Sequence, residues 1–187
     1  MKESGLVKFK HFWKNKKGAV TIEFLFMSMF LIVLFAFLFD LVMLRSTLGK
    51  LDNASYTLVS ILRERTQLYD RVAQINIDDH KQFEKLAKKL IYGDQNSNKR
   101  IDVVLEYWAQ DGSGRRIPNI IGDCTPYKKL SDLSYLSPRS ELNNERKIPL
   151  YQITLCVETQ GLFETILLDK SERSTGLIRS SSMSVSR

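Results

Sequence analysis

A glycine and a glutamate stand where a basic segment of the chain meets an apolar one. The string from Lys14 to Phe24 reads KNKKGAVTIEF, so Gly18 closes the lysines and Glu23 is the fifth residue after it. Because Gly18 has no side chain, it leaves the adjacent carbonyl open to a protease and keeps the backbone adaptable. Glu23 lies inside the apolar run, where a carboxylate is costly and usually has a partner. Glu23 is therefore a candidate for a charge pairing, and Gly18 marks the boundary between the basic and the apolar segment.

Glu23 taken alone has a simpler interpretation. A carboxylate near the start of a helix can extend toward the membrane interface and favour the positive end of the helix dipole. Glu23 does not stand alone, because Gly18, the preceding lysines and the abrupt start of the apolar run accompany it. This combination favours a charge pairing for Glu23 over the simpler interpretation.

The apolar run is long enough to cross a membrane. Residues 24–39 read FLFMSMFLIVLFAFLF, and extension back to Ala19 adds Glu23 as the only charge. The 21 residues from Ala19 to Phe39 would span roughly 32 Å as a helix, about the thickness of a bilayer core. A buried helix of a soluble protein is disfavoured, because so short a chain has little else to cover a helix that is apolar on all sides.

The charge distribution orients this segment. The 187 residues carry a net charge of +7, and residues 1–18 hold six lysines and one acid, against 22 basic and 20 acidic groups in the rest. Lysines beside a membrane helix mark its cytoplasmic flank, so everything after Arg45 is expected outside the cytoplasm. Because the charge excess is not on the folded domain, nucleic-acid binding is disfavoured.

A secretory signal peptide and an uncleaved membrane anchor are the two alternatives for this N-terminal segment. A secretory signal peptide would have a shorter apolar region followed by a small-x-small cleavage site, and no such site follows here. An uncleaved membrane anchor has the same topology and stays open as an alternative.

Helical periodicity continues beyond the apolar run. Residues spaced alternately by four and three form a stripe that predicts one helix from about Val20 to about Leu68: Leu44, Leu48, Leu51, Ser55, Leu58 and Leu62. A second helix is predicted from about Asp79 to Tyr92, with Asp78 or Asp79 as its cap and Gly93 at its end.

The remaining sequence predicts strands and loops. Strands are expected over residues 101–109 and 148–159 and, with weaker patterns, over 162–168 and 177–185; a turn is expected at 111–114 and a surface loop over 128–147. The predicted fold is α+β, a long N-terminal transmembrane helix that continues into a small globular domain with an antiparallel sheet. The predicted parts are a leader (1–18), a transmembrane helix (19–44), its extramembrane continuation (45–72) and the α+β domain (73–187).

Cys124 and Cys156 both follow the membrane segment, with 31 residues between them. An exported domain meets an oxidising compartment, and two cysteines allow one connectivity, so a disulfide is predicted. Two buried free thiols are the alternative.

Signals for an enzyme or a cofactor are weak. His80 is the one histidine after residue 18, and the chain has no Gly-x-Ser-x-Gly string and no phosphate-binding loop. Residues 94–98 space three oxygen ligands like a calcium loop, but Lys99 and Leu105 replace its glycine and glutamate, so we expect a polar turn there. Neither an enzyme activity nor a cofactor is expected.

The leader and the mature start resemble the class III signal of type IV pilins and pseudopilins. Within that group, Ala19-Val-Thr-Ile-Glu-Phe, the strand YQITLCV at residues 151–157 and the ending IRSSSMSVSR are similar to TadE/TadF-like minor pseudopilins of the tight-adherence (Tad) pilus. Many type IV pilins have phenylalanine where this chain has Ala19, so it resembles the main type IVa pilins less.

This resemblance implies a site and a set of partners. A prepilin peptidase would cut between Gly18 and Ala19 on the cytoplasmic side, and Glu23 would pair with the new N-terminus of a neighbouring subunit. The chain would be a minor subunit in assembly of a Tad-type pilus for adherence and biofilm formation, anchored in the inner membrane with a periplasmic domain. Its partners would be other pilin or pseudopilin subunits and the inner-membrane assembly machinery. The alternative is an uncleaved, membrane-anchored binding or scaffold protein of the periplasm.

Overall fold

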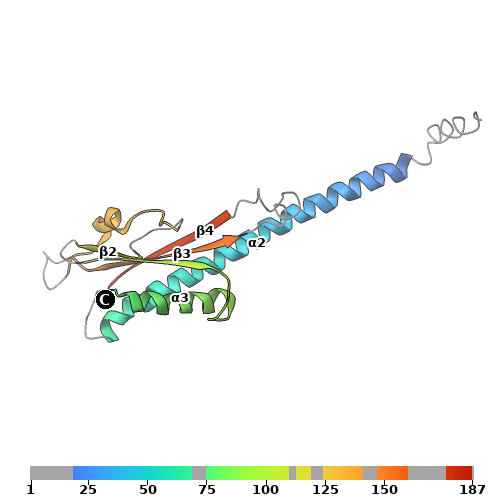
Figure 1. The fold of residues 1–187 in the computed structure, drawn as a ribbon. Helices are drawn as coiled ribbons and strands as arrows, with labels where there is room; N and C mark the ends of the chain where they lie inside the picture. Colours follow the sequence, from blue (N-terminus) through green and yellow to red (C-terminus); the bar gives the residue numbers. More distant parts are fainter. Residues whose placement is uncertain are drawn as a thin grey trace, which may run out of the picture. The chain divides into compact units, whose positions relative to one another are not determined.

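The computed structural model describes residues 19–68, 75–109, 113–118, 124–140, 147–159 and 176–186 (Figure 1). The elements are α2 (Ala19–Leu68), α3 (Ile77–Tyr92), β1 (Ile101–Trp108), β2 (Gly114–Ile117), the 3-10 helix η2 (Leu130–Leu136), β3 (Leu150–Thr159) and β4 (Gly176–Val185). The predicted leader, the weak strand at 162–168 and parts of the predicted turn and loop lie outside the described residues. The chain divides into two compact units, Met1–Val42 and Met43–Arg187.

The α2 helix runs without interruption over the length that the sequence predicted. Its 50 residues contain no proline, and Gly49 is the only glycine. Hydroxyl side chains along it bond to carbonyls of the preceding turn, for example Ser28 Oγ to Leu25 O at 2.9 Å and Thr57 Oγ1 to Asn53 O at 2.8 Å. These side chains therefore satisfy their polar groups within the helix itself.

The second unit contains the part of α2 that packs on the sheet. Leu51, Leu58 and Leu62 are fully or almost fully buried in the main core, whereas Leu44 is 44% exposed. The predicted stripe is therefore a core face only from Leu51 onward. At Ser55 this face becomes polar, because its Oγ lies 3.0 Å from Ser180 Oγ and 2.7 Å from Ser182 Oγ of β4.

The sheet is antiparallel, with strand order β2-β1-β3-β4. Successive side chains of a strand point to opposite faces. Val103, Leu105 and Tyr107 of β1 share one core with apolar residues of α2 and α3, whereas Val104 and Trp108 belong to two smaller clusters with residues of the 124–130 segment. The two helices thus cover one face, and the segment with η2 covers the other (Figure 1).

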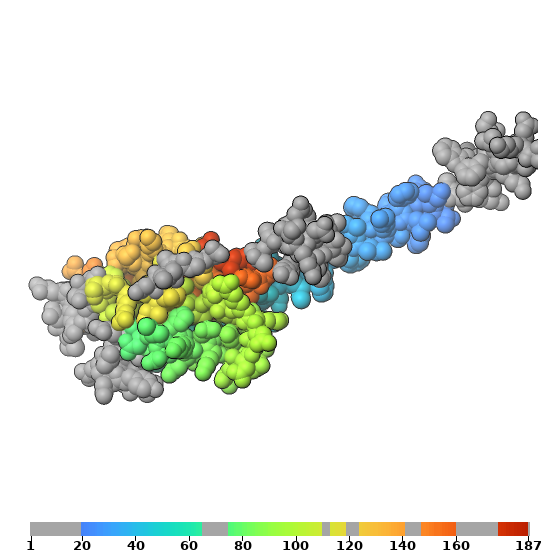
Figure 2. Space-filling view, viewed as in Figure 1, coloured from blue at the N-terminus to red at the C-terminus, as the bar shows by residue number. Residues whose placement is uncertain are grey.

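The α3 helix begins earlier than the sequence predicted. Its N-cap is Asn76, and the Asp79 carboxylate accepts the Asn76 N–H at 2.7 Å, so neither Asp78 nor Asp79 is the cap. Its end is as predicted, because Gly93 has φ 78°, a left-handed conformation that glycine adopts at little cost. In Figure 2 the helix and the residues after it lie side by side at the surface, in green and yellow-green.

Two other predictions need correction. The segment 128–147 was predicted as a plain surface loop, but it contains η2, and Leu130 and Ser137 within it are buried. Strand β2 was not predicted at all, because Arg115 and Arg116 interrupt any apolar alternation; it forms by pairing with β1, with Glu106 opposite Arg116.

Candidate functional site

The N-terminal half of α2 is apolar and exposed. Among the described residues, Val20–Glu64 is the one helix long and apolar enough to cross a membrane, and none of its most apolar window is buried by the chain itself. Large apolar side chains from Val20 to Leu44 are between 42% and 71% exposed. Burying such surface is favourable by about 25 cal/mol per Å². A lipid or protein environment is therefore required to cover it.

Glu23 is an exposed carboxylate within this apolar surface. Within α2, Glu23 lies four residues after Ala19, about one helical turn along the chain. Among the described residues Glu23 has no hydrogen-bond or ion-pair partner. A positive group outside this helix, or one at the start of the helix, can therefore pair with the Glu23 carboxylate. Gly18 lies outside the described residues.

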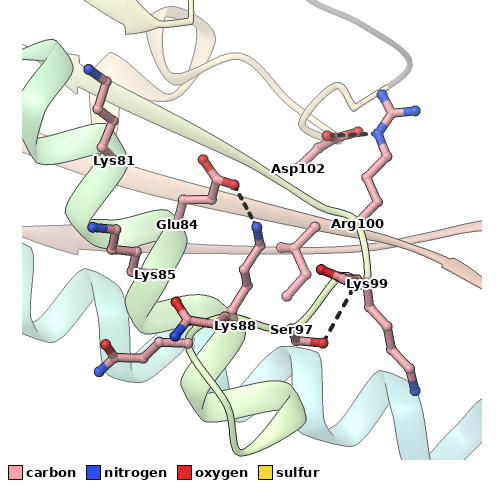
Figure 3. A pocket seen from close by; sticks show the side chains of 12 residues that line it. Lys81, Glu84, Lys85, Lys88, Ser97, Lys99, Arg100 and Asp102 are labelled. Atoms are coloured by element: carbon pink, nitrogen blue, oxygen red, sulfur yellow. Dashed lines mark hydrogen bonds and ion pairs between the residues drawn. The ribbon is translucent and has the colours of Figure 1, made fainter.

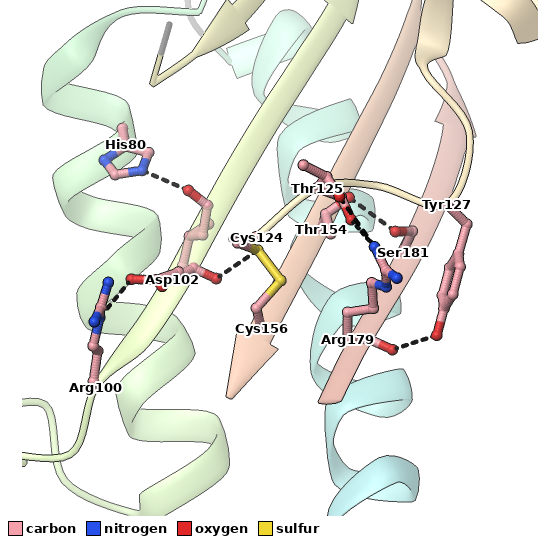
Figure 4. Close-up of a disulfide and its surroundings, with 11 residues drawn as sticks. His80, Arg100, Asp102, Cys124, Thr125, Tyr127, Thr154, Cys156, Arg179 and Ser181 are labelled. Atoms are coloured by element: carbon pink, nitrogen blue, oxygen red, sulfur yellow. Dashed lines mark hydrogen bonds and ion pairs between the residues drawn. A yellow bond between two sulfur atoms is a disulfide. The ribbon is translucent and has the colours of Figure 1, made fainter. Parts of the chain in front are cut away.

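Cys124 and Cys156 form a disulfide, with their Cα atoms 5.7 Å apart (Figure 4). Cys156 is in β3, and Cys124 begins the segment 124–140, which we call the strap. Both cysteines are buried. The predicted bond therefore ties the strap to the sheet face that the helices leave uncovered.

Polar contacts hold the start of the strap beside the disulfide (Figure 4). Arg179 of β4 donates from Nη1 to both the carbonyl and the hydroxyl oxygen of Thr125, each at 3.0 Å. Its guanidinium lies 4.7 Å from the centre of the Tyr127 ring, and the Tyr127 hydroxyl donates to the Arg179 carbonyl at 3.3 Å. No local pattern in the sequence indicates this role of Arg179, because its partners are far away along the chain.

A buried carboxylate lies beneath the strap. Glu106 is 6% exposed, and its Oε1 lies 2.8 Å from Arg116 Nε, although the N–H is not aligned as a hydrogen bond. Its Oε2 and the Oε1 of Gln152, the residue opposite it on β3, are buried with no hydrogen-bond partner in the described part of the chain. Burial raises the pKa of Glu106, while Arg116, the Leu130 N–H and Lys129 act in the lowering direction.

This raised pKa predicts a measurable dependence of stability on pH. The folded domain retains the Glu106 proton at a higher pH than the unfolded chain does. The contribution of Glu106 to the stability of the fold therefore rises as the pH falls through the folded pKa toward the usual pKa of 4.5. We expect the difference in unfolding free energy between wild type and Glu106→Gln to change with pH, with a slope of at most about 1.4 kcal/mol per pH unit. Urea unfolding at several pH values measures it, and a constant difference would contradict the assignment.

The remaining polar candidates have structural roles. His80 Nε2 lies 2.7 Å from the Val103 carbonyl and so links α3 to β1. The Asn96 N–H donates to Asp94 Oδ1 at 3.0 Å, as in the predicted polar turn. Within the described ranges, no group of three or more His, Cys, Asp or Glu residues could hold a metal ion.

Comparison with known proteins gives the family. Residues 11–187 match the family model of TadF, "Putative tight adherence pilin protein F". Searches of curated proteins and of solved structures gave no significant match. The matched range includes the apolar helix, which fits a single-pass membrane anchor in a pilin, and every strand of the sheet. The chain therefore belongs to the TadF family of tight-adherence pilin proteins.

Proposed function

We propose that this chain is a minor pilin or pseudopilin subunit that takes part in assembly of a Tad-type pilus used for adherence and biofilm formation. Residues 1–18 are a leader that a prepilin peptidase removes between Gly18 and Ala19. The lysines of the leader hold the N-terminus in the cytoplasm. The apolar helix stays in the inner membrane, and the disulfide-bonded domain lies in the periplasm.

The observation that carries this proposal is the exposed carboxylate of Glu23 on the apolar helix α2, which has no hydrogen-bond or ion-pair partner among the described residues. A carboxylate at membrane depth needs a partner. Cleavage after Gly18 creates a positive α-amino group on Ala19, and the same group on a neighbouring subunit is available to Glu23. Such pairing fixes the axial position of one subunit against the next. The disulfide supports export, because such bonds persist in oxidising compartments.

A substitution at Glu23 separates maturation from assembly. We expect Glu23→Ala to be cleaved normally but to lose pilus formation, because removing one partner of a buried charge pair costs about 3–5 kcal/mol. The N-terminal residue of the protein from native membranes is read by mass spectrometry, and pili are counted by electron microscopy.

Matched variants test whether the effect belongs to the charge. Glu23→Asp retains the carboxylate and should preserve part of the assembly, while Thr21→Ala makes a small change on the same turn and should leave it normal. Normal pili in the Glu23→Ala strain would contradict the pairing. An intact Met1 terminus in the wild type, with active peptidase in the same cells, would instead indicate the uncleaved anchored scaffold.

A further inference from the structure

The surface between α3 and β1 contains a hollow lined mainly by charged and amide side chains. It has a volume of about 700 Å³, within the usual range of ligand pockets of about 300–1,000 Å³. Its lining includes five cationic residues and two acidic ones (Figure 3). We call it the α3–β1 groove. The five cations are Lys81, Lys85, Lys88, Lys99 and Arg100.

The positive charge is only partly neutralised. Lys88 lies 3.0 Å from Glu84, and Arg100 lies 3.3 Å from both Asp102 and Glu158. In the described ranges, Lys81 and Lys85 have no ion-pair partner. They are four residues apart on one helix face, where like charges repel each other. An anionic ligand would relieve this repulsion.

The loop that closes the groove is held in shape by its own contacts. Gly93 turns the chain, Asp94 accepts the Asn96 N–H, and Ser97 Oγ accepts the Lys99 N–H at 3.4 Å. The Lys99 ammonium lies 5.1 Å from the centre of the Tyr92 ring. The basic groups are thus displayed on an ordered support, which reduces the entropy lost when a ligand binds.

We propose that the α3–β1 groove binds an acidic polysaccharide, with the lysines pairing to its carboxylate or sulfate groups. Amide and hydroxyl side chains of Gln95, Asn96, Ser97 and Asn98 also line the groove and can hydrogen-bond to sugar hydroxyls. A lipid surface fits less well, because Ile101, the only apolar side chain in the described part of the lining, is buried and cannot insert between acyl chains. A nucleic acid fits less well, because the described residues that line the groove include no aromatic side chain for base stacking.

Binding is tested on the full-length protein in a nonionic detergent. The probes are polygalacturonate as the acidic polymer and dextran as a neutral one. We expect binding to polygalacturonate, a decrease as salt is raised, and no binding to dextran. The double variant Lys81→Gln/Lys85→Gln should weaken binding roughly tenfold. Both side chains are exposed, so the unfolding midpoint should not fall.

The control removes two lysines elsewhere on the same domain. Lys128→Gln/Lys129→Gln has the same change in charge at exposed positions of the strap and should bind like wild type. An equal loss in both double variants, or no loss in the groove variant, would overturn the proposal. So would equal binding of a DNA duplex or of short-chain phosphatidylglycerol. This proposal depends on the proposed function only in that the domain is exported. The assay measures binding and not pilus assembly, so the two proposals can fail separately.

Discussion

A Gly18→Phe variant is expected to accumulate with its leader attached. If a peptidase approaches the carbonyl after Gly18, a benzyl side chain at that position obstructs it directly. A steric penalty of about 3 kcal/mol in the transition state slows cleavage by roughly 100-fold. Intact-mass measurement of the membrane protein should therefore show Met1 rather than Ala19 as the first residue. Because the α-amino group of Ala19 is then never released, pili should be lost as well.

Two matched variants make this result interpretable. Gly18→Ala stays small and should be processed, whereas Gly5→Phe places the same bulky side chain elsewhere in the leader and should leave cleavage unchanged. If Gly18→Phe were processed at the wild-type rate, Gly18 would not be the recognised residue. If Gly5→Phe blocked processing equally, the effect would belong to the leader as a whole.

The sequence predicted the elements that depend on local periodicity. The α2 helix follows from unbroken apolar spacing without proline, and its C-terminal stripe at Leu51, Leu58 and Leu62 is buried. The disulfide followed from counting, because two cysteines in a domain that the sequence predicts to be exported have one way to pair. The Asn76 cap was missed, although Asn76 followed by Asp79 has the spacing of a capping box and could have been found.

Other features depend on residues far apart in the chain, which one sequence does not bring together. Ser55 interrupts an apolar stripe for no local reason, and its partner Ser180 lies 125 residues away. Strand β2 forms because it pairs with the edge of β1 and because Arg116 forms an ion pair with Glu106. Glu106 lies in an otherwise mostly apolar strand. From the sequence alone, a glutamate in an alternating strand is expected on the exposed face of the sheet. The strap that buries it is positioned by the disulfide and by β4.

Loss of the disulfide is expected to have the largest effect on stability. The bond links residues 32 apart in sequence, so the chain-entropy model gives about 3–4 kcal/mol for its removal. In the double variant Cys124→Ala/Cys156→Ala, the urea midpoint should fall by about 1–4 M, from the usual dependence of unfolding free energy on urea. Trp108 packs with Leu130 of the strap and is the only tryptophan after residue 18, so its fluorescence reports the change.

Reduction of the wild type provides the internal control. A thiol reductant should lower the wild-type midpoint to that of the double variant and should not affect the variant further. An unchanged midpoint after complete reduction would show that the bond does not restrain the domain. If Trp108 fluorescence changes before helical circular dichroism is lost, the strap detaches locally before the sheet and helices unfold.

Arg179 determines how far the strap depends on the covalent bond. Its side chain donates to Thr125 next to Cys124 and lies over Tyr127, so it holds the same end of the strap without a covalent link. Arg179→Ala should cost about 1 kcal/mol when the disulfide is present, the usual value of a hydrogen bond. In the cysteine-free background the cost should change, because neighbouring contacts that hold one segment are not additive. If the two effects simply add, the disulfide and Arg179 act independently, and the strap is held at two separate points.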